Sequence, residues 1–228
     1  MRVATWNIER LRHKNELDNI VANCEQVAAE ILVLTETDSQ VELGYNFCFS
    51  TAPPENEIVR YKATETRVSI YTNYELVKRY ATFDEHTAAC VELKTDLGNL
   101  IVYGTVIGIY GNRHDSFMPD LSAQVADIER LASYGNPVCI CGDYNCSFSD
   151  NYYFTKDGRA RIEDMLIMNR LELLTRNQPE CIDHISVSRE LVGDSEVLVK
   201  EWNLDKKLSD HKGIMVEFTG QNRVSIKE

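Results

Sequence analysis

Five segments of the chain place asparagine, glutamate, aspartate or histidine at the border of a short apolar run. In each segment the polar residue stands where a run rich in apolar and β-branched residues begins or ends. These residues are Asn7 and Glu9, Glu36, Asp143 and Asn145, Asp183 and His184, and Asp210 and His211. One such border is usually a strand end that meets solvent, but five of them predict a single edge of the sheets where chemistry takes place.

The side chains at these borders are of the types that bind hard cations and move protons. Oxygen ligands such as those of Asn7 and Glu36 suit Mg²⁺ or Mn²⁺. A carboxylate such as Asp143 can orient or deprotonate an attacking water. An imidazole held by a carboxylate, His211 with Asp183, can stabilise charge that develops on a phosphate. The pattern therefore predicts metal-assisted hydrolysis of a phosphate ester.

Five short motifs in a fixed order make the chain similar to a known superfamily. They read TWNIER, LTET, GDYN, IDHI and SDH, and they span residues 6 to 211. The set resembles the motifs of the endonuclease/exonuclease/phosphatase superfamily, which includes deoxyribonucleases, apurinic-site endonucleases, sphingomyelinases, inositol-polyphosphate phosphatases and deadenylases. The resemblance implies a four-layer α/β sandwich, in which two mixed β-sheets pack face to face with helices outside.

The metal site implied by the resemblance draws on the ends of three segments. Asn7 and Glu36 are expected to bind the metal, and Asp210 is expected to lie beside it. Glu9 matches a position where the family often has an acidic residue near a second ion, and we expect it nearer the rim. The implied cofactor is Mg²⁺, for which Mn²⁺ can substitute.

The catalytic group implied by the resemblance draws on the remaining segments. Asp143 is expected to activate the water, Asn145 to contact the phosphate, and Asp183 to hold His211 against the scissile phosphate. Neighbours of these motifs are further candidates for contact with the substrate, namely Arg10, Tyr144 and His184. For His184 the alternative is a packed strand residue, and for Asp143 and Asn145 it is a turn that caps the next segment.

The strand before the long helix departs from the family pattern. Many nucleases of the family carry a histidine or tyrosine on this strand, where the chain reads YGTVIG. Thr105 or Val106 stands at that place, so the phosphate contact made there in relatives needs another residue. His114, in the following loop, is a candidate.

Apolar patterning predicts the elements that must position these residues. Strands are expected at residues 3–8, 31–36, 67–73, 88–95, 100–108, 137–145, 182–188 and 213–218. Apolar positions with helical spacing predict helices from residue 17, over 120–135 and around 162–169. Because some strands follow one another directly and others are separated by a helix, we expect one α/β domain with mixed sheets over residues 1–228.

Composition restricts the class of protein further. The chain has 24 basic and 36 acidic residues, a formal net charge of −12, which argues against a protein that coats polyanions. Seven cysteines without paired C-x-x-C spacing argue against zinc and favour buried reduced thiols in the cytoplasm. We see no signal peptide, and no apolar run approaches the ~20 residues of a membrane span.

We therefore expect a Mg²⁺-dependent phosphoesterase that hydrolyses a phosphodiester by direct attack of water, with nucleic acid as the first candidate substrate. Basic residues beside the motifs, at 10–14 and 205–212, form a candidate positive rim, and the aromatic residues of NYYF (151–154) are candidates for base stacking. Both segments are also compatible with ordinary surface and core. The alternatives are a phosphomonoesterase, a lipid-headgroup phosphodiesterase of the inositol-phosphate or sphingomyelin type, and a catalytically silent binding protein. The intact motif set argues against the last of these.

Overall fold

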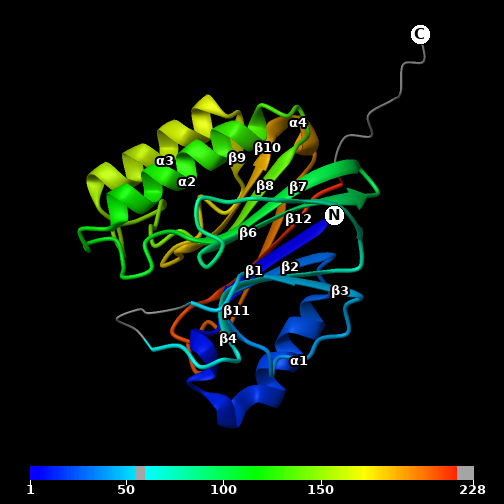
Figure 1. Cartoon of the computed structure of the whole chain (residues 1–228), viewed down its shortest axis with the longest axis vertical. Coiled ribbons are helices and arrows are strands. Elements are labelled where there is room, and N and C mark those ends of the chain that lie inside the picture. Colours follow the sequence, from blue (N-terminus) through cyan, green and yellow to red (C-terminus); the bar gives the residue numbers. More distant parts are fainter. Residues whose placement is uncertain (55–59, 220–228) are drawn as a thin grey trace.

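Two six-stranded sheets pack face to face at the centre of the computed structural model, which describes residues 1–54 and 60–219. Helices cover both outer faces (Figure 1). Helix α1 (Leu17–Val27) packs outside the first sheet, and α2 (Phe117–Ala132) and α3 (Lys156–Met168) pack side by side outside the second. The predicted four-layer α/β sandwich with mixed sheets is confirmed.

The first sheet has the strand order β11-β12-β1-β2-β4-β3. Strand β1 (Arg2–Asn7) runs parallel to β2 (Ile31–Asp38) and antiparallel to β12 (Gly213–Glu217). The end of β1, the end of β2 and the start of β12 therefore meet at one edge of the sheet. The remaining strands are β3 (Phe47–Ser50), β4 (Glu65–Thr72) and β11 (Leu198–Trp202).

The second sheet has the strand order β5-β6-β7-β8-β10-β9. Strand β7 (Gly98–Val106) runs parallel to β8 (Val138–Asp143), and β10 (Asp183–Ser188) runs antiparallel to β8. This register sets Asp183 directly opposite Asp143. The remaining strands are β5 (Glu75–Tyr80), β6 (Ala88–Thr95) and β9 (Leu171–Leu173).

Strand alternation divides the core into layers. On β8, Cys139 and Cys141 face the first sheet, whereas Val138 and Ile140 face the helices α2 and α3. This is the two-residue period expected of an extended chain. Because both faces of the strand are covered, all six of its residues are buried, which explains its continuous apolar sequence.

All eight predicted strands and all three predicted helices are present. The sequence did not predict β3, β5, β9, β11, the short helix α4 (Arg189–Val192) or the 3₁₀ turns at Glu9–Leu11 and Lys14–Glu16. All seven cysteines are free thiols and six of them are buried, as expected. Among the helices of residues 1–54 and 60–219, none is long and apolar enough to cross a membrane. The cytoplasmic location stays a prediction.

Candidate active site

The end of β1 meets the end of β8 through one buried hydrogen bond. Asn7 Nδ2 donates to Asp143 Oδ2 at 3.2 Å, and Asn7 Oδ1 accepts from the Glu9 backbone N–H at 2.9 Å. Both Asn7 and Asp143 are buried. Since the two strands belong to different sheets, this bond joins the sheets at the predicted shared edge. Asn7 lines one pocket together with Glu36 and His211, as the sequence predicted.

Asp183 and His211 form a second, partly buried contact at this edge. His211 Nδ1 lies 2.6 Å from Asp183 Oδ2, a distance at which the ring N–H donates to the carboxylate. Ligand atoms of Asp143, Asp183 and His211 all lie within 4.8 Å of one another. Asp183 Oδ1 is buried and has no hydrogen-bond partner among the described residues. The three groups are therefore close enough to share one proton network or one bound ion.

Burial and mutual charge shift the pKa values of this group. Burial raises the pKa of Asp143 to about 7, although the charge of His211 opposes the shift. For His211, burial lowers the pKa, but the charges of Asp183, Asp143 and Asp210 outweigh it and raise the pKa to about 10. In the metal-free protein a charged imidazole thus stands beside a carboxyl group whose pKa is near neutrality, which suits a general base.

The loop before β12 is fixed by a serine that sequence reasoning missed. The Ser209 hydroxyl donates to Asn7 O at 2.6 Å and accepts from the His211 backbone N–H at 3.1 Å. Trp6 Nε1 and Asn203 Nδ2 both donate to His211 O, at 3.1 and 2.7 Å. The backbone of His211 is therefore held directly against the end of β1. The signal for Ser209 was its place in the SDH motif.

A pocket of about 370 Å³ opens beside this network. The oxygen ligands at its surface come from Asn7, Glu9, Glu36 and Asp210, and His211 lies at its border. Among the described residues, those that line the pocket include three carboxylates and one amide and no cysteine. This donor set fits a hard divalent cation such as Mg²⁺ or Mn²⁺.

Four of the candidate residues have a left-handed backbone conformation, among them Glu9 with φ 48° and Arg10 with φ 54°. Glu36 has φ 44°, and the pairing of β2 with β4 passes from Thr35 to Thr37 without it. Asn145 has φ 49°. Such conformations are strained for residues other than glycine and are concentrated at functional sites.

Arg10 contacts the carboxylate that is the main candidate for metal binding. Its Nε lies 3.4 Å from Glu36 Oε2, and its Nη1 lies 3.9 Å from Glu65 Oε2. Its guanidinium also packs over the Tyr61 ring, 4.8 Å from the centroid. Arg10 lines the pocket, a position from which it could reach a substrate. Its contact with substrate stays a prediction.

Glu9 and Asp210 differ in depth within the pocket. Glu9 is only 8% exposed, and its Oε2 accepts from the Asp210 backbone N–H at 2.8 Å. The Asp210 side chain is 69% exposed, and its Oδ1 lies 3.5 Å from His211 Nε2. Glu9 was expected nearer the rim than Asn7, and with Asn7 only 1% exposed Glu9 is the more exposed of the two. Its role near a second ion stays a prediction.

Asn145 is oriented toward the backbone and Asp143. Its backbone N–H donates to Asp143 Oδ1 at 2.8 Å, and its Nδ2 donates to Ile107 O at 3.1 Å and Gly108 O at 3.3 Å. In this conformation the residue positions the Asp143 carboxylate. Its contact with a phosphate stays a prediction.

Two predicted substrate contacts are wrong. Tyr144 is fully buried, and its hydroxyl bonds Ile140 O at 3.2 Å and Ser186 Oγ at 3.0 Å. His184 is also fully buried, and burial lowers its pKa to about 4. Its ring bonds Thr175 Oγ1 and the Cys146 carbonyl, at 2.8 and 2.9 Å. Both side chains belong to the core. For His184 this is the alternative that the sequence left open, a packed strand residue.

Aromatic and basic side chains that the sequence did not single out complete the pocket. Thr105 is buried and bonds Gln124 at 2.6 Å, so it does not replace the missing histidine or tyrosine of β7. Tyr110, in the loop after β7, lines the pocket and packs against His114 with 4.9 Å between ring centroids. Tyr61 and Arg67 line the pocket as well. The missing histidine or tyrosine on β7 thus pointed to the correct loop, but within it Tyr110 rather than His114 reaches the pocket.

Comparison with known proteins gives matches of sequence pattern and fold. The family model described as "Endonuclease/Exonuclease/phosphatase family" matches residues 4–211. A search of curated proteins gave no significant match. The fold is similar to that of a 3′ phosphatase from Neisseria, solved with product DNA hairpin, at TM-score 0.70 and 15% identity over 96% of this chain and 99% of that one.

Two further solved structures share the fold. An endonuclease/exonuclease/phosphatase from Beutenbergia cavernae gives TM-score 0.68 at 14% identity, over 96% of this chain and 71% of that one. An AP endonuclease from Archaeoglobus fulgidus gives TM-score 0.65 at 14% identity, over 96% of this chain and 99% of that one. At identities this low, the similarity of these structures establishes a common fold and nothing more.

Proposed function

The chain belongs to the endonuclease/exonuclease/phosphatase family, and from this premise we propose that it is a Mg²⁺-dependent nuclease that hydrolyses a phosphodiester bond by direct attack of water. Members of the family are hydrolases that act on phosphoester bonds. We propose that Mn²⁺ can replace Mg²⁺ and that residues 1–228 act as one catalytic domain. The common core between the two sheets supports the single domain.

One observation carries the proposal. Asp143, Asp183 and His211 lie within 4.8 Å of one another, next to a pocket whose oxygen ligands include Asn7 and Glu36. A base, a charged imidazole and a set of metal ligands are the components required for attack of water on a phosphate. They come from five segments of the chain and from both sheets, so their convergence supports a shared role.

The protein groups divide the proton and charge transfers between them. Asp143 accepts the proton of the attacking water, since its buried carboxyl group has a pKa of about 7. His211 uses Nδ1 to donate to Asp183, which leaves Nε2 to donate to a phosphate oxygen as negative charge develops there. Asn7 and Asn145 fix the two oxygens of Asp143 and thereby orient the base.

Glu36 and Asn7 would hold the metal, and Asp210 and Glu9 line the same pocket. A divalent cation bound there would withdraw charge from the phosphate as phosphorus becomes five-coordinate. Arg10 lies beside this carboxylate, with Nε 3.4 Å from Glu36 Oε2. Its guanidinium is a candidate contact for a phosphate of the substrate.

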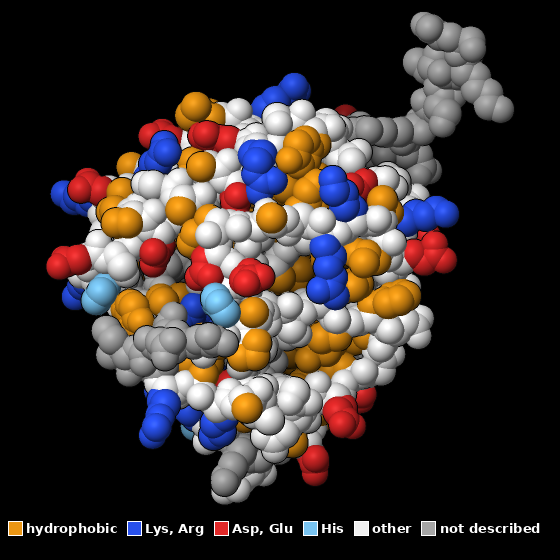
Figure 2. Space-filling view, viewed as in Figure 1, with side chains coloured by type: hydrophobic (Ala, Val, Ile, Leu, Met, Phe, Trp, Pro, Cys, Tyr) orange, Lys and Arg blue, Asp and Glu red, His pale blue; other side chains and the backbone are white. Residues whose placement is uncertain are grey.

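Nucleic acid is the substrate class that the comparisons favour. The Neisseria structure is described as bound to a product DNA hairpin, and the Archaeoglobus protein is named an AP endonuclease. Each of these structures matches 96% of this chain. On the face seen in Figure 2, acidic and basic side chains are interspersed among apolar and neutral ones. Attraction of a polyanion by this acidic chain must therefore be local, through the metal and the basic residues beside the site.

A metal-supplemented activity panel tests the proposal. Purified protein is assayed with Mg²⁺, with Mn²⁺ and with EDTA on single- and double-stranded DNA, RNA, bis-p-nitrophenyl phosphate, inositol polyphosphates and sphingomyelin. We expect metal-dependent cleavage of a nucleic acid and none with EDTA. Cleavage confined to the inositol phosphates or sphingomyelin would overturn the substrate class. Absence of hydrolysis on every substrate would indicate a binding protein.

A further inference from the structure

We propose that Tyr152 and Lys206 form a nucleotide subsite beside His211. In this subsite an unpaired base next to the scissile phosphate stacks on the Tyr152 ring, and the adjoining phosphate contacts the Lys206 ammonium. The inference rests on the proposed function and specifies it further, because it assigns a single-stranded segment to the substrate.

The two side chains contact each other across 54 residues of sequence. Lys206 Nζ donates to the Tyr152 hydroxyl at 2.9 Å and lies 4.7 Å from the ring centroid. The ammonium is thus nearer to the hydroxyl than to the centre of the ring. Tyr152 remains 48% exposed, which leaves ring surface for a stacking partner. A tyrosine ring exposed to this degree is a suitable platform for any base.

The pair adjoins the catalytic group. Tyr152 and Lys206 line a small pocket together with Asp183, Asp210 and His211. Asp210 and His211 also line the pocket of the candidate metal site. His211 therefore lies between the two pockets. A phosphate bound at His211 has the metal ligands on one side and the Tyr152–Lys206 pair on the other.

The charge of Lys206 is more available to a phosphate than that of its neighbours. Lys207 Nζ lies 2.7 Å from Asp205, and Lys212 Nζ lies 3.3 Å from Glu201 and donates to Pro179 O at 2.8 Å. Lys206 instead donates to a neutral hydroxyl. Because no carboxylate among residues 1–54 and 60–219 pairs with Lys206, its positive charge can attract a polyanion.

Both residues are anchored to fixed loops. The Tyr152 backbone N–H donates to Asp150 Oδ1 at 3.0 Å. The Lys206 backbone N–H donates to Asn203 O at 3.0 Å, and Asn203 Nδ2 in turn donates to His211 O at 2.7 Å. The same asparagine therefore positions the subsite and the backbone of the proposed catalytic histidine. This connection favours a substrate that contacts both at once.

The stacking surface selects for an unpaired base. A base can lie flat on a protein ring only when it has left its own duplex stack. Single-stranded ends, loops or extruded nucleotides satisfy this condition, whereas the interior of an intact duplex does not.

The test compares Tyr152→Ala with wild type on a single-stranded oligonucleotide, a blunt duplex and bis-p-nitrophenyl phosphate. We expect KM for the single strand to rise about tenfold, with kcat within about twofold of wild type, because stacking contributes to binding of the chain. Hydrolysis of bis-p-nitrophenyl phosphate, which has no base, should be unchanged. Tyr152→Phe, which keeps the ring, should retain most of the affinity, and Lys206→Gln should weaken binding less at high salt than at low salt.

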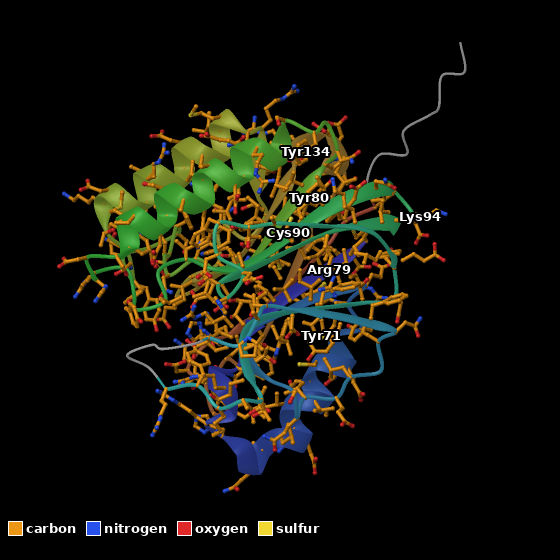
Figure 3. All side chains as sticks on the ribbon, viewed as in Figure 1. Tyr71, Arg79, Tyr80, Cys90, Lys94 and Tyr134 are labelled. Carbon is orange, nitrogen blue, oxygen red and sulfur yellow. The ribbon has the colours of Figure 1, made fainter. Side chains whose placement is uncertain are left out.

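Tyr134→Ala is the matched control. Tyr134 is 49% exposed, and its hydroxyl accepts from Arg130 at 3.2 Å, so it is an exposed tyrosine paired with a cation. Tyr134 stacks on Tyr80 (Figure 3). It lies between the end of α2 at Ala132 and the start of β8 at Val138, whereas Asp143 ends β8. This variant should match wild type on all three substrates.

A binding measurement separates failure of the subsite from failure of the proposed function. Fluorescence anisotropy of a labelled single strand is measured with Asp143→Asn and with Asp143→Asn/Tyr152→Ala. About tenfold weaker binding by the double variant supports the subsite even if wild type hydrolyses no substrate, an outcome that would overturn the nuclease proposal alone. Equal binding by the two variants, or an equal loss of activity on the oligonucleotide and on bis-p-nitrophenyl phosphate, would overturn the subsite.

Discussion

Asn7 and Asp143 are separated by 136 residues of sequence, yet their side chains are hydrogen-bonded at 3.2 Å where the two sheets meet. The amide is neutral, so it fixes the carboxylate without adding charge to a site that already contains several acids. The bond links the pocket lined by Glu36 and Asp210 to the network of Asp183 and His211. The predictions below test this connected arrangement.

Asp143→Asn should abolish turnover while preserving the fold. The substitution is nearly isosteric, but it removes the group that accepts the proton of water, and such groups contribute about 10²–10⁴-fold in rate. Steady-state kinetics and circular dichroism check this. Asp164→Asn, at an exposed position of α3, is the control and should be fully active. A folded Asp143→Asn enzyme with wild-type kcat would exclude Asp143 as the base.

Glu36→Gln should weaken binding of the divalent cation before any turnover is measured. Losing an outer partner of a metal ligand typically costs 10–100-fold in affinity, and the loss of a direct carboxylate ligand should be at least as large. Titration of the protein with Mn²⁺, followed by calorimetry, provides the dissociation constant. Glu129→Gln, at an exposed position of α2, should bind as wild type does. Unchanged affinity in Glu36→Gln would place the ion elsewhere.

Ser209→Ala should lower both stability and activity. The substitution leaves the His211 backbone N–H and the carbonyl of Asn7 without their shared partner in a fully buried position. Loss of a buried hydrogen-bond partner costs about 1–3 kcal/mol, measurable by urea denaturation. Because His211 loses one of its two links to β1, kcat should fall more than KM rises. A variant as stable as wild type would show that the loop is held by Trp6 and Asn203 alone.

His211 and His184 should titrate at opposite ends of the pH range in the metal-free protein. The pKa of His211 is raised to about 10 by the neighbouring carboxylates, whereas burial lowers that of His184 to about 4. NMR of the imidazole groups should therefore find His211 protonated and His184 neutral at pH 7, with His211→Gln and His184→Gln used for assignment. A neutral His211 at pH 7 would contradict the charge assigned to it.

The same shift has a consequence for stability. The folded-state pKa of His211 lies above its ordinary value of 6.5, so its contribution is complete below pH 6.5 and is lost as pH rises through about 10. Asp183→Asn should remove this contribution. The difference in free energy of unfolding between wild type and Asp183→Asn should thus shrink as pH rises toward 10.

The elements that the sequence predicted are those with a strong apolar signal. Strand β8 is buried at every position, so its sequence reveals it. By contrast, β3, β5 and β11 are mostly exposed or half-exposed, and β5 (Glu75–Tyr80) has no fully buried residue. These strands form through pairing with a neighbour, and such pairing leaves little trace in composition. The three-residue β9 is too short to produce a period.

The candidate site was predictable where a motif and strand alternation agreed. Asp143 and Asn145 stand two apart beyond the apolar run of β8, and Asn145 donates to the Asp143 carboxylate. Tyr144, between them, points to the opposite side and into the core, so alternation itself excluded it as a substrate contact. Tyr110 and Tyr61 lie in loops, whose course depends on tertiary packing and not on any local period.

The position of β12 determines when the site can first exist during synthesis. Residues 213–217 are made after Glu36, Asp143 and Asp183, yet they pair with β1 near the start of the described residues. Until they emerge from the ribosome, one edge of β1 stays open, and Asn7 has neither Ser209 nor His211 beside it. A nascent chain that already carries Glu36, Asp143 and Asp183 therefore lacks the complete candidate site until β12 pairs with β1.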